Sequence, residues 1–155
     1  MQNRREMLSH SAKVAAMLAA VGLMPGLARA QAAVYNTAAF SAKTMAEVMK
    51  ALGAAMPAES KDVTITGPDI AENGAVVPVG AATTLPGVKR LLMMVEKNPA
   101  MLAAMFNVTD AIDANISTRV KMGQSSDVYA VAMMNDGKVL FARKEIKVTL
   151  GGCGG

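Results

Sequence analysis

The feature that most restricts the fold is a β-hairpin pattern near the C-terminal end. Residues 127–134 are mostly apolar, Asn135-Asp136-Gly137 follows, and a second arm runs over residues 138–150. An Asp-Gly pair between two such segments is a strong hairpin signal. The second arm ends with Ile146, Val148 and Leu150 alternating with Lys147 and Thr149. The sequence therefore predicts two antiparallel strands with one buried face.

Further short segments predict a sheet of several strands. Residues 63–66 and 116–122 alternate between apolar and polar side chains, whereas 75–79 and 91–95 are apolar runs bounded by Gly, Pro or Asn. Residues 103–108 are compatible with a strand, but the four-residue spacing of Met101 and Met105 leaves a helix open. About seven short strands near ten-residue intervals, without helices between them, predict an all-β fold: an immunoglobulin-like antiparallel β-sandwich.

One short N-terminal helix is expected before the strands, after a loop that contains Tyr35 and Phe40. Apolar residues from Met45 to Met56 recur at helical spacing. Thr44 and Glu47 match a capping box, and Pro57 marks the point by which the helix has ended.

Residues 1–30 are expected to be an export signal. Arg4-Arg5 precedes an apolar stretch over residues 14–24, and Ala28-Arg29-Ala30 is a small-x-small cleavage site. The paired arginines predict the twin-arginine type. The apolar stretch of 11 residues is about half a membrane-spanning helix, so no membrane anchor is expected. We predict cleavage near Ala30, with a second site two residues later, a single domain over residues 31–150, and an arm over residues 151–155.

Removal of this signal changes which functions the composition allows. The mature chain keeps twelve basic and eleven acidic residues, so the formal charge falls from +4 to about +1 and no nucleic-acid partner is expected. His10, the single histidine, is removed as well. Without an imidazole the mature chain cannot form a Ser-His-Asp or Cys-His arrangement, so conventional hydrolase chemistry is disfavoured and we expect no enzyme activity.

The chemistry of the chain is concentrated in its last five residues. Cys153 is the single cysteine, and it lies between Gly151-Gly152 and Gly154-Gly155. Glycines provide no side chains to bury the sulfur, so we expect an exposed thiol on a flexible arm that extends ~10 Å beyond Leu150. The nearest cation in sequence is Lys147, so nothing in the arm activates the thiol. Cys153 is therefore predicted to be a covalent attachment point, and the protein a carrier.

Several of these elements resemble the SoxY family, the sulfur-carrier subunits of the thiosulfate-oxidising Sox system. They are the export signal, the segment from Gly67 to Val79 (GPDIAENGAVVPV), the Glu96-Lys97-Asn98-Pro99 step and, above all, the terminal GGCGG. The resemblance covers essentially the whole mature chain.

The resemblance implies a periplasmic heterodimer with SoxZ, in which Cys153 carries thiosulfate and its oxidation products on a swinging arm formed by Gly151, Gly152, Gly154 and Gly155. It implies loading by the SoxAX cytochrome, release of sulfate by the SoxB thiohydrolase, and further oxidation by the sulfur dehydrogenase SoxCD or transfer to another acceptor. No catalytic residue, cofactor or metal transfers to this sequence.

Three functions other than a carrier have partial support in the sequence. The mature chain has ten methionines, Met93-Met94 and Met133-Met134 among them, which could bind copper(I) in an exported metal chaperone, although core packing explains them. Ubiquitin-like sulfur carriers also end in Gly-Gly but work in the cytosol, and a thiol oxidoreductase would need a second cysteine.

Two surface features have structural interpretations beside functional ones. Glu72-Asn73-Gly74 is favoured as a turn, in which Asn and Gly tolerate positive φ, over a partner contact. Four basic residues have two equally good interpretations: they lie on a solvated strand face, or they assist docking of anionic partners. These residues are Arg119, Lys121, Lys144 and Lys147.

Overall fold

The computed structural model describes residues 36–149. The export signal, its cleavage site, Leu150 and the terminal Gly-Gly-Cys-Gly-Gly lie outside the described residues, and predictions about them remain predictions. No helix within residues 36–149 has the length and apolar character needed to span a membrane.

Two helices precede the strands. They are α2 (Thr37–Ser41) and α3 (Met45–Leu52). The strands of the described range are β1 (Ala58–Glu59), β2 (Val63–Thr66), β3 (Ile70–Ala71), β4 (Val77–Thr83), β5 (Val88–Val95), β6 (Leu102–Asn107), β7 (Asn115–Val120), β8 (Ser126–Met134) and β9 (Val139–Val148).

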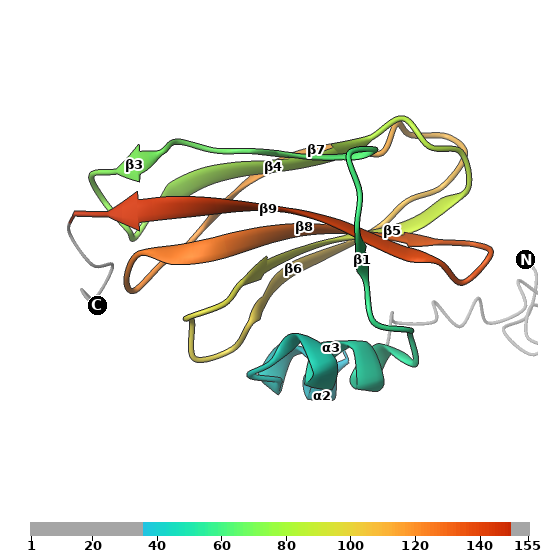
Figure 1. Ribbon diagram of the computed structural model, residues 1–155, viewed down its shortest axis with the longest axis horizontal. Coiled ribbons are helices and arrows are strands. Elements are labelled where there is room, and N and C mark those ends of the chain that lie inside the picture. The colour runs from blue at the N-terminus through green and yellow to red at the C-terminus, as the bar shows by residue number, and fades with distance from the viewer. Residues whose placement is uncertain (1–35, 150–155) are drawn as a thin grey trace, which may run out of the picture. The chain divides into compact units, whose positions relative to one another are not determined.

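The strands form two sheets that pack face to face, which confirms the predicted immunoglobulin-like β-sandwich (Figure 1). The larger sheet has the order β1-β9-β8-β5-β6, with β3 also paired to β9, and the smaller sheet has the order β2-β4-β7. Leu91, Met93, Val128 and Ile146 of the larger sheet pack in one core with residues of the smaller sheet such as Val79.

The larger sheet is buried on both faces around β5, because α2 and α3 cover that part of the face that points away from the smaller sheet (Figure 1). Leu92 and Met94 pack there with Val48 and Met49 of α3. This arrangement explains why residues 91–95 of β5 are a continuous apolar run: the odd positions face one core and the even positions the other.

The methionines are mainly packing residues, as the core interpretation predicted. Met93 and Met94 are buried on opposite faces of the larger sheet, so their sulfurs are directed into different cores. Met56 is the exception, since its exposed fraction is 60%. This distribution favours packing over a shared soft-metal site.

The predicted helix is α3, and its capping box is confirmed. The Thr44 hydroxyl accepts a hydrogen bond from the Glu47 N–H, and the Glu47 carboxylate accepts one from the Thr44 N–H. Gly53, with a φ of 65°, ends the helix ahead of Pro57. The expectation of a loop around Phe40 is wrong: α2 forms there, with the Asn36 side chain accepting from the Ala39 N–H. A helix of one turn has too little periodicity to be detected in the sequence.

The strand expected around residues 103–108 is confirmed as β6, paired with β5, and the helix that was left open there does not form. The other strand predictions need two corrections. The run expected over residues 75–79 begins as a strand at Val77 and continues to Thr83. The prediction of a purely antiparallel sandwich missed β1 and β3, which pair parallel with β9. Two-residue strands contain no periodicity, and their partner is distant in sequence.

The hairpin prediction is confirmed. β8 and β9 pair antiparallel over Ser126↔Ile146 to Met133↔Val139, and Gly137 in the turn has a φ of 88°. β9 thus pairs with β8 from Val139 to Ile146. Its last residue, Val148, lies five positions before Cys153.

Candidate functional site at the end of β9

The described residues end four positions before Cys153. Cys153 and the glycines at 151, 152, 154 and 155 lie outside the described residues, so their geometry is not part of the site described below. Thr149 is the last described residue. The contacts of β9 and Thr149 therefore determine how firmly the base of this segment is held.

The segment around β3 holds the end of β9 on one side. The Lys147 N–H donates to the Asp69 carbonyl at 3.0 Å, and the Thr149 N–H donates to the Ala71 carbonyl at 3.1 Å. The Thr149 hydroxyl also donates to the Glu72 carbonyl at 3.3 Å. The backbone is thus tied in place up to the last described residue.

Lys144 fastens the same segment through its side chain. Its ammonium nitrogen lies 2.8 Å from a carboxylate oxygen of Asp69 and donates to the Gly67 carbonyl at 2.7 Å. The hydrogen bond and charge of Lys144 lower the pKa of the Asp69 carboxyl. For Lys144 the solvated-face interpretation is therefore wrong, because its side chain is only 30% exposed and is occupied by two intramolecular contacts. Arg119, Lys121 and Lys147 are exposed, as that interpretation expects.

A second set of contacts holds the end of β9 from the β8 side. The Val148 N–H donates to the Ser125 hydroxyl at 2.9 Å. Asn98 fixes the loop that carries Ser125: its side-chain amide donates to the Lys121 carbonyl at 2.7 Å and its oxygen accepts from the Gly123 N–H at 3.4 Å. The two sequence elements that supported the family resemblance, residues 67–79 and 96–99, thus both contact the loop over residues 121–123, which precedes Ser125.

The interpretation of Glu72-Asn73-Gly74 as a turn is confirmed, but its expected geometry is wrong. The Asn73 side chain accepts from the Ala75 N–H at 2.8 Å, and the Gly74 carbonyl accepts from the Met122 N–H at 2.7 Å. The described glycines with positive φ are Gly53, Gly87 and Gly137. The turn is therefore stabilised by an Asx-type hydrogen bond rather than by left-handed backbone.

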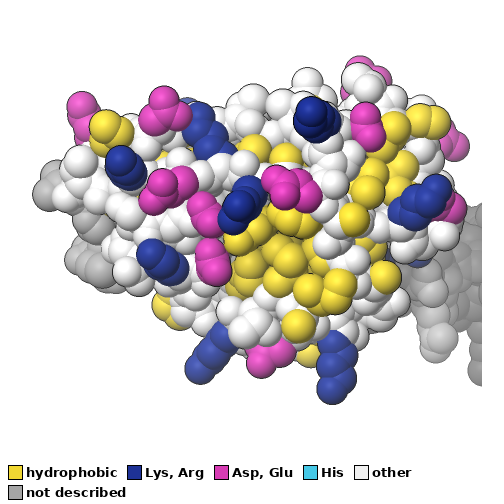
Figure 2. All heavy atoms as spheres, viewed as in Figure 1, with side chains coloured by type: hydrophobic (Ala, Val, Ile, Leu, Met, Phe, Trp, Pro, Cys, Tyr) yellow, Lys and Arg dark blue, Asp and Glu magenta, His cyan; other side chains and the backbone are white. Residues whose placement is uncertain are grey.

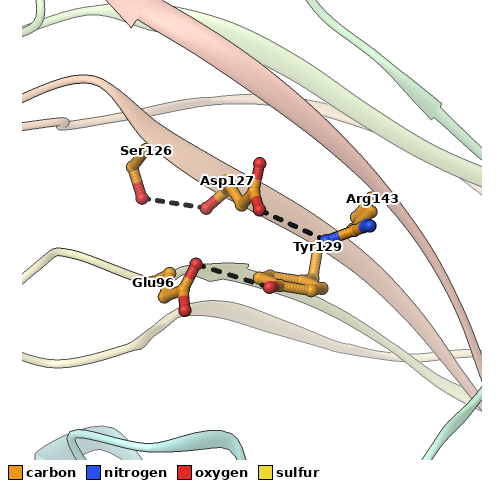
Figure 3. A network of polar contacts seen from close by, with 5 residues as sticks. All are labelled: Glu96, Ser126, Asp127, Tyr129 and Arg143. Carbon is orange, nitrogen blue, oxygen red and sulfur yellow. Dashed lines mark hydrogen bonds and ion pairs between the residues drawn. The ribbon is translucent and has the colours of Figure 1, made fainter.

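A polar cluster lies at the start of β8 (Figure 3). The Tyr129 hydroxyl donates to Glu96 at 3.4 Å, Arg143 lies 3.6 Å from Asp127, and the Ser126 hydroxyl donates to the Asp127 carbonyl at 2.9 Å. Burial, followed by the charges of Glu96 and Asp127, raises the pKa of the Tyr129 phenol. The phenol therefore stays protonated at neutral pH, and the contacts of the cluster connect Glu96, β8 and β9.

An apolar groove of about 440 Å³ lies between β9 and the helices. Figure 2 shows hydrophobic side chains gathered in this part of the face. Residues that line the groove include Met45, Met56, Tyr129 and Phe141. Phe141 is seven positions before Val148, so the groove borders the other half of β9. In residues 36–149 no group of three or more His, Cys, Asp or Glu side chains is placed to hold a metal ion.

Cys153 stays a prediction from the sequence, and the contacts that hold the end of β9 were not predicted. The parallel pairing of β3 with β9 and the Lys144–Asp69 contact join residues more than 70 positions apart. The sequence shows that Asp69 follows a Gly-Pro step and that Lys144 lies within a predicted strand. Neither position indicates that the two side chains form an ion pair.

Comparison with known proteins is consistent with this geometry. The family model described as sulfur oxidation protein SoxY matches residues 48–153. The sulfur carrier protein SoxY from Chlorobium limicola f thiosulfatophilum is 31% identical, with a TM-score of 0.62, over 70% of this chain and 97% of that one. A comparison with curated protein sequences finds no significant match.

More distant structures share the fold alone. A single-substitution variant of the superoxide reductase (neelaredoxin) from Ignicoccus hospitalis is 18% identical with a TM-score of 0.50, over 56% of this chain and 78% of that one. A putative superoxide reductase from Thermotoga maritima is 10% identical with the same TM-score of 0.50, over 59% of this chain and 93% of that one.

Fold and sequence together define an immunoglobulin-like β-sandwich protein of sulfur oxidation, a carrier and not an enzyme. The chain belongs to the SoxY family. The family match includes residues 67–72, which contact the end of β9, and reaches Cys153.

Proposed function

We propose that this protein carries sulfur covalently on Cys153 and presents the bound intermediates to the enzymes of thiosulfate oxidation. The observation that carries the proposal is the construction of the end of β9. Contacts from residues 67–72 and from Ser125 hold the chain up to Thr149, and four positions later the single cysteine lies among glycines. A fixed base followed by glycines suits a thiol that must enter a narrow site in another protein.

The loading step is an oxidation in which two sulfur atoms become bonded. The Cys153 thiolate and thiosulfate would form a cysteine S-thiosulfonate, Cys–S–S–SO₃⁻, and the two electrons released would be taken up by the c-type cytochrome partner, SoxAX, together with its own electron acceptor. Hydrolysis by SoxB then breaks the bond between the sulfane sulfur and the sulfonate sulfur, with one water consumed and sulfate and two protons released. A persulfide remains on Cys153 for SoxCD or another acceptor.

The chain itself contributes the attachment atom and its placement. The described residues contain no histidine and no cysteine, so activation of the thiol comes from the protein that encloses the arm. We propose that Gly151, Gly152, Gly154 and Gly155 form a flexible arm, that no resident cofactor or metal takes part, and that the working unit is a heterodimer with SoxZ. We also propose export to the periplasm through the signal over residues 1–30.

The test is intact-mass measurement of the mature protein in complex with SoxZ. Incubation with thiosulfate, SoxAX and an electron acceptor is expected to add one S₂O₃ unit, and later addition of SoxB is expected to leave one sulfur atom. Cys153→Ser is the matched control and should stay unmodified at every step. An unmodified wild-type protein, or an equal adduct on Cys153→Ser, would contradict the proposal.

A further inference from the structure

The two ladders that hold the end of β9 stop within two residues of each other. On the β8 side the last backbone pair is Ser126↔Ile146, and on the β3 side it is Ala71↔Val148. Figure 1 shows β3 beside the last residues of β9. Both neighbouring strands therefore leave β9 between five and seven positions before Cys153.

On the β8 side, the side chain of Ser125 takes the place of the next backbone acceptor. Continuation of the β8–β9 register would place Gln124 opposite Val148, and the Gln124 carbonyl would then accept from the Val148 N–H. Instead, the backbone bends at residues 123–125, and the Val148 N–H donates to the Ser125 hydroxyl at 2.9 Å. The hydroxyl holds Val148 without continuing the ladder.

On the β3 side, a turn ends the ladder. The Thr149 N–H donates to the Ala71 carbonyl at 3.1 Å, so the next acceptor in a parallel ladder would be the Asn73 carbonyl. That carbonyl accepts from the Val76 N–H at 3.4 Å, and the Asn73 side chain accepts from the Ala75 N–H at 2.8 Å. The segment therefore turns away from β9 at this point.

The loop that carries the Ser125 hydroxyl is fixed by contacts of its own. The Asn98 side chain is hydrogen bonded to the backbone of residues 121 and 123. Met122 is fully buried in the core, and its N–H donates to the Gly74 carbonyl at 2.7 Å. The hydroxyl is therefore in position before any partner protein binds.

The last held residue determines how much chain separates the folded domain from the sulfur. With Thr149 held, Cys153 is four residues further on, and its Cα lies no more than ~14 Å from that of Thr149. Release of Val148 and Thr149 would make Lys147 the last held residue and would lengthen the tether to six residues, or ~21 Å. The effective concentration of a tethered group falls roughly as the −3/2 power of tether length, so this release would lower it by about twofold.

We propose that Ser125 is a positioning residue for the reactions at Cys153, because its hydroxyl ends the β8–β9 ladder at Val148 and so determines where the cysteine-bearing arm begins. The proposal rests on the covalent carrier function proposed above. Ser125 touches no substrate and acts through the backbone of Val148. Its role concerns the length of the tether, so it applies to every enzyme that acts on Cys153.

The first measurement is hydrogen exchange at the end of β9. Ser125→Ala removes the acceptor of the Val148 N–H, whereas Ser125→Thr keeps a hydroxyl at the same position. Exchange of the Thr149 amide is the readout, because its own acceptor, the Ala71 carbonyl, is unchanged in both variants. It should become about fivefold faster in Ser125→Ala, as expected for the loss of one hydrogen bond, and stay at the wild-type rate in Ser125→Thr.

The second measurement is single-turnover loading of the carrier heterodimer with thiosulfate, an electron acceptor and excess SoxAX. In Ser125→Ala the rate constant at saturating SoxAX should fall about twofold, because the tether is longer. The half-saturating SoxAX concentration should not change, because the substitution leaves the docking surfaces intact. Insertion of two glycines between Gly151 and Gly152 adds the same length and should cause the same loss, while Ser125→Thr should load like the wild type.

Ser126→Ala is the matched control. The Ser126 hydroxyl accepts from the Lys97 N–H and donates to the Asp127 carbonyl, neither of which lies on β9, so this variant should lose stability but load at the wild-type rate. Wild-type loading by Ser125→Ala, an equal loss in Ser126→Ala or Ser125→Thr, or no effect of the inserted glycines would overturn the positioning role and leave the carrier function supported. A wild-type protein that is not loaded would overturn both.

Discussion

The ammonium of Lys144, in the last strand, lies 2.8 Å from the carboxylate of Asp69, 75 positions earlier in the chain. This contact and the adjacent hydrogen bond from Lys144 to the Gly67 carbonyl connect the segment before β3 to β9. Lys144, which makes both contacts, lies five positions before Thr149, the last described residue. The pair therefore holds the segment before β3 against β9 close to the last described residue, which is four positions before Cys153.

Asp69→Asn should lower the melting temperature at neutral pH, because the amide keeps the shape of the side chain and loses its charge. The pKa of the Asp69 carboxyl is below its usual value of 3.8 in the folded protein. Its contribution to stability is therefore present above pH 3.8 and is lost as the pH falls through the lowered pKa. The difference in melting temperature between wild type and variant should shrink in that range.

Lys144→Met provides the comparison for this pair, because it removes the contacts to both Asp69 and Gly67. Its melting temperature at neutral pH should lie below that of Asp69→Asn. Hydrogen exchange of the Lys147 and Thr149 amides should be faster in both variants. Equal melting temperatures for wild type and Asp69→Asn throughout the pH range would show that the ion pair does not hold this segment.

Asn98→Ala should destabilise the protein by about 1–2 kcal/mol, since it leaves the Lys121 carbonyl and the Gly123 N–H without their side-chain partner. Urea denaturation measures this loss. Asn107→Ala serves as the control, because Asn107 accepts one exposed hydrogen bond from Arg90, and its effect should be within about 0.5 kcal/mol. Similar values for the two variants would contradict the assigned role of Asn98.

Leu92→Ala should cost about 2–5 kcal/mol, as much as Leu91→Ala, because both leucines are fully buried on opposite faces of the larger sheet. In a sandwich without helices on its outer face, a side chain such as Leu92 would face solvent and its truncation would have little effect. Chemical denaturation of the two variants compares the cores directly. A loss below about 1 kcal/mol for Leu92→Ala alone would mean that the helices pack loosely.

Thr44→Ala should lower the free energy of unfolding by about 1 kcal/mol, because the helix loses the hydroxyl that accepts from the Glu47 N–H. Thr44→Ser keeps a hydroxyl at the same position and should remain near the wild-type value. Thermal unfolding monitored by circular dichroism separates the two variants. If alanine and serine behaved alike, the capping hydrogen bond would not be a determinant of stability.

The elements that could be predicted from sequence are those specified by neighbouring residues. The Asn135-Asp136-Gly137 turn, the capping box at Thr44 and the alternation in β7 each depend on residues a few positions apart, and each is present in the structure. The helix α2 was missed because a single turn has too little periodicity. The short strands β1 and β3 were missed because they pair with residues of β9 that lie more than 70 positions later in the sequence.

The candidate site divides in the same way. The single cysteine among four glycines is complete in a five-residue stretch, so its proposed chemistry follows from the sequence itself. The role of Lys144 could not be predicted, because an isolated lysine in a strand has the same pattern whether it is solvated or paired. Tertiary structure alone brings Lys144 to Asp69, and residues 67–72 and Ser125 to the end of β9, because those contacts form only when strands distant in sequence assemble into one sandwich.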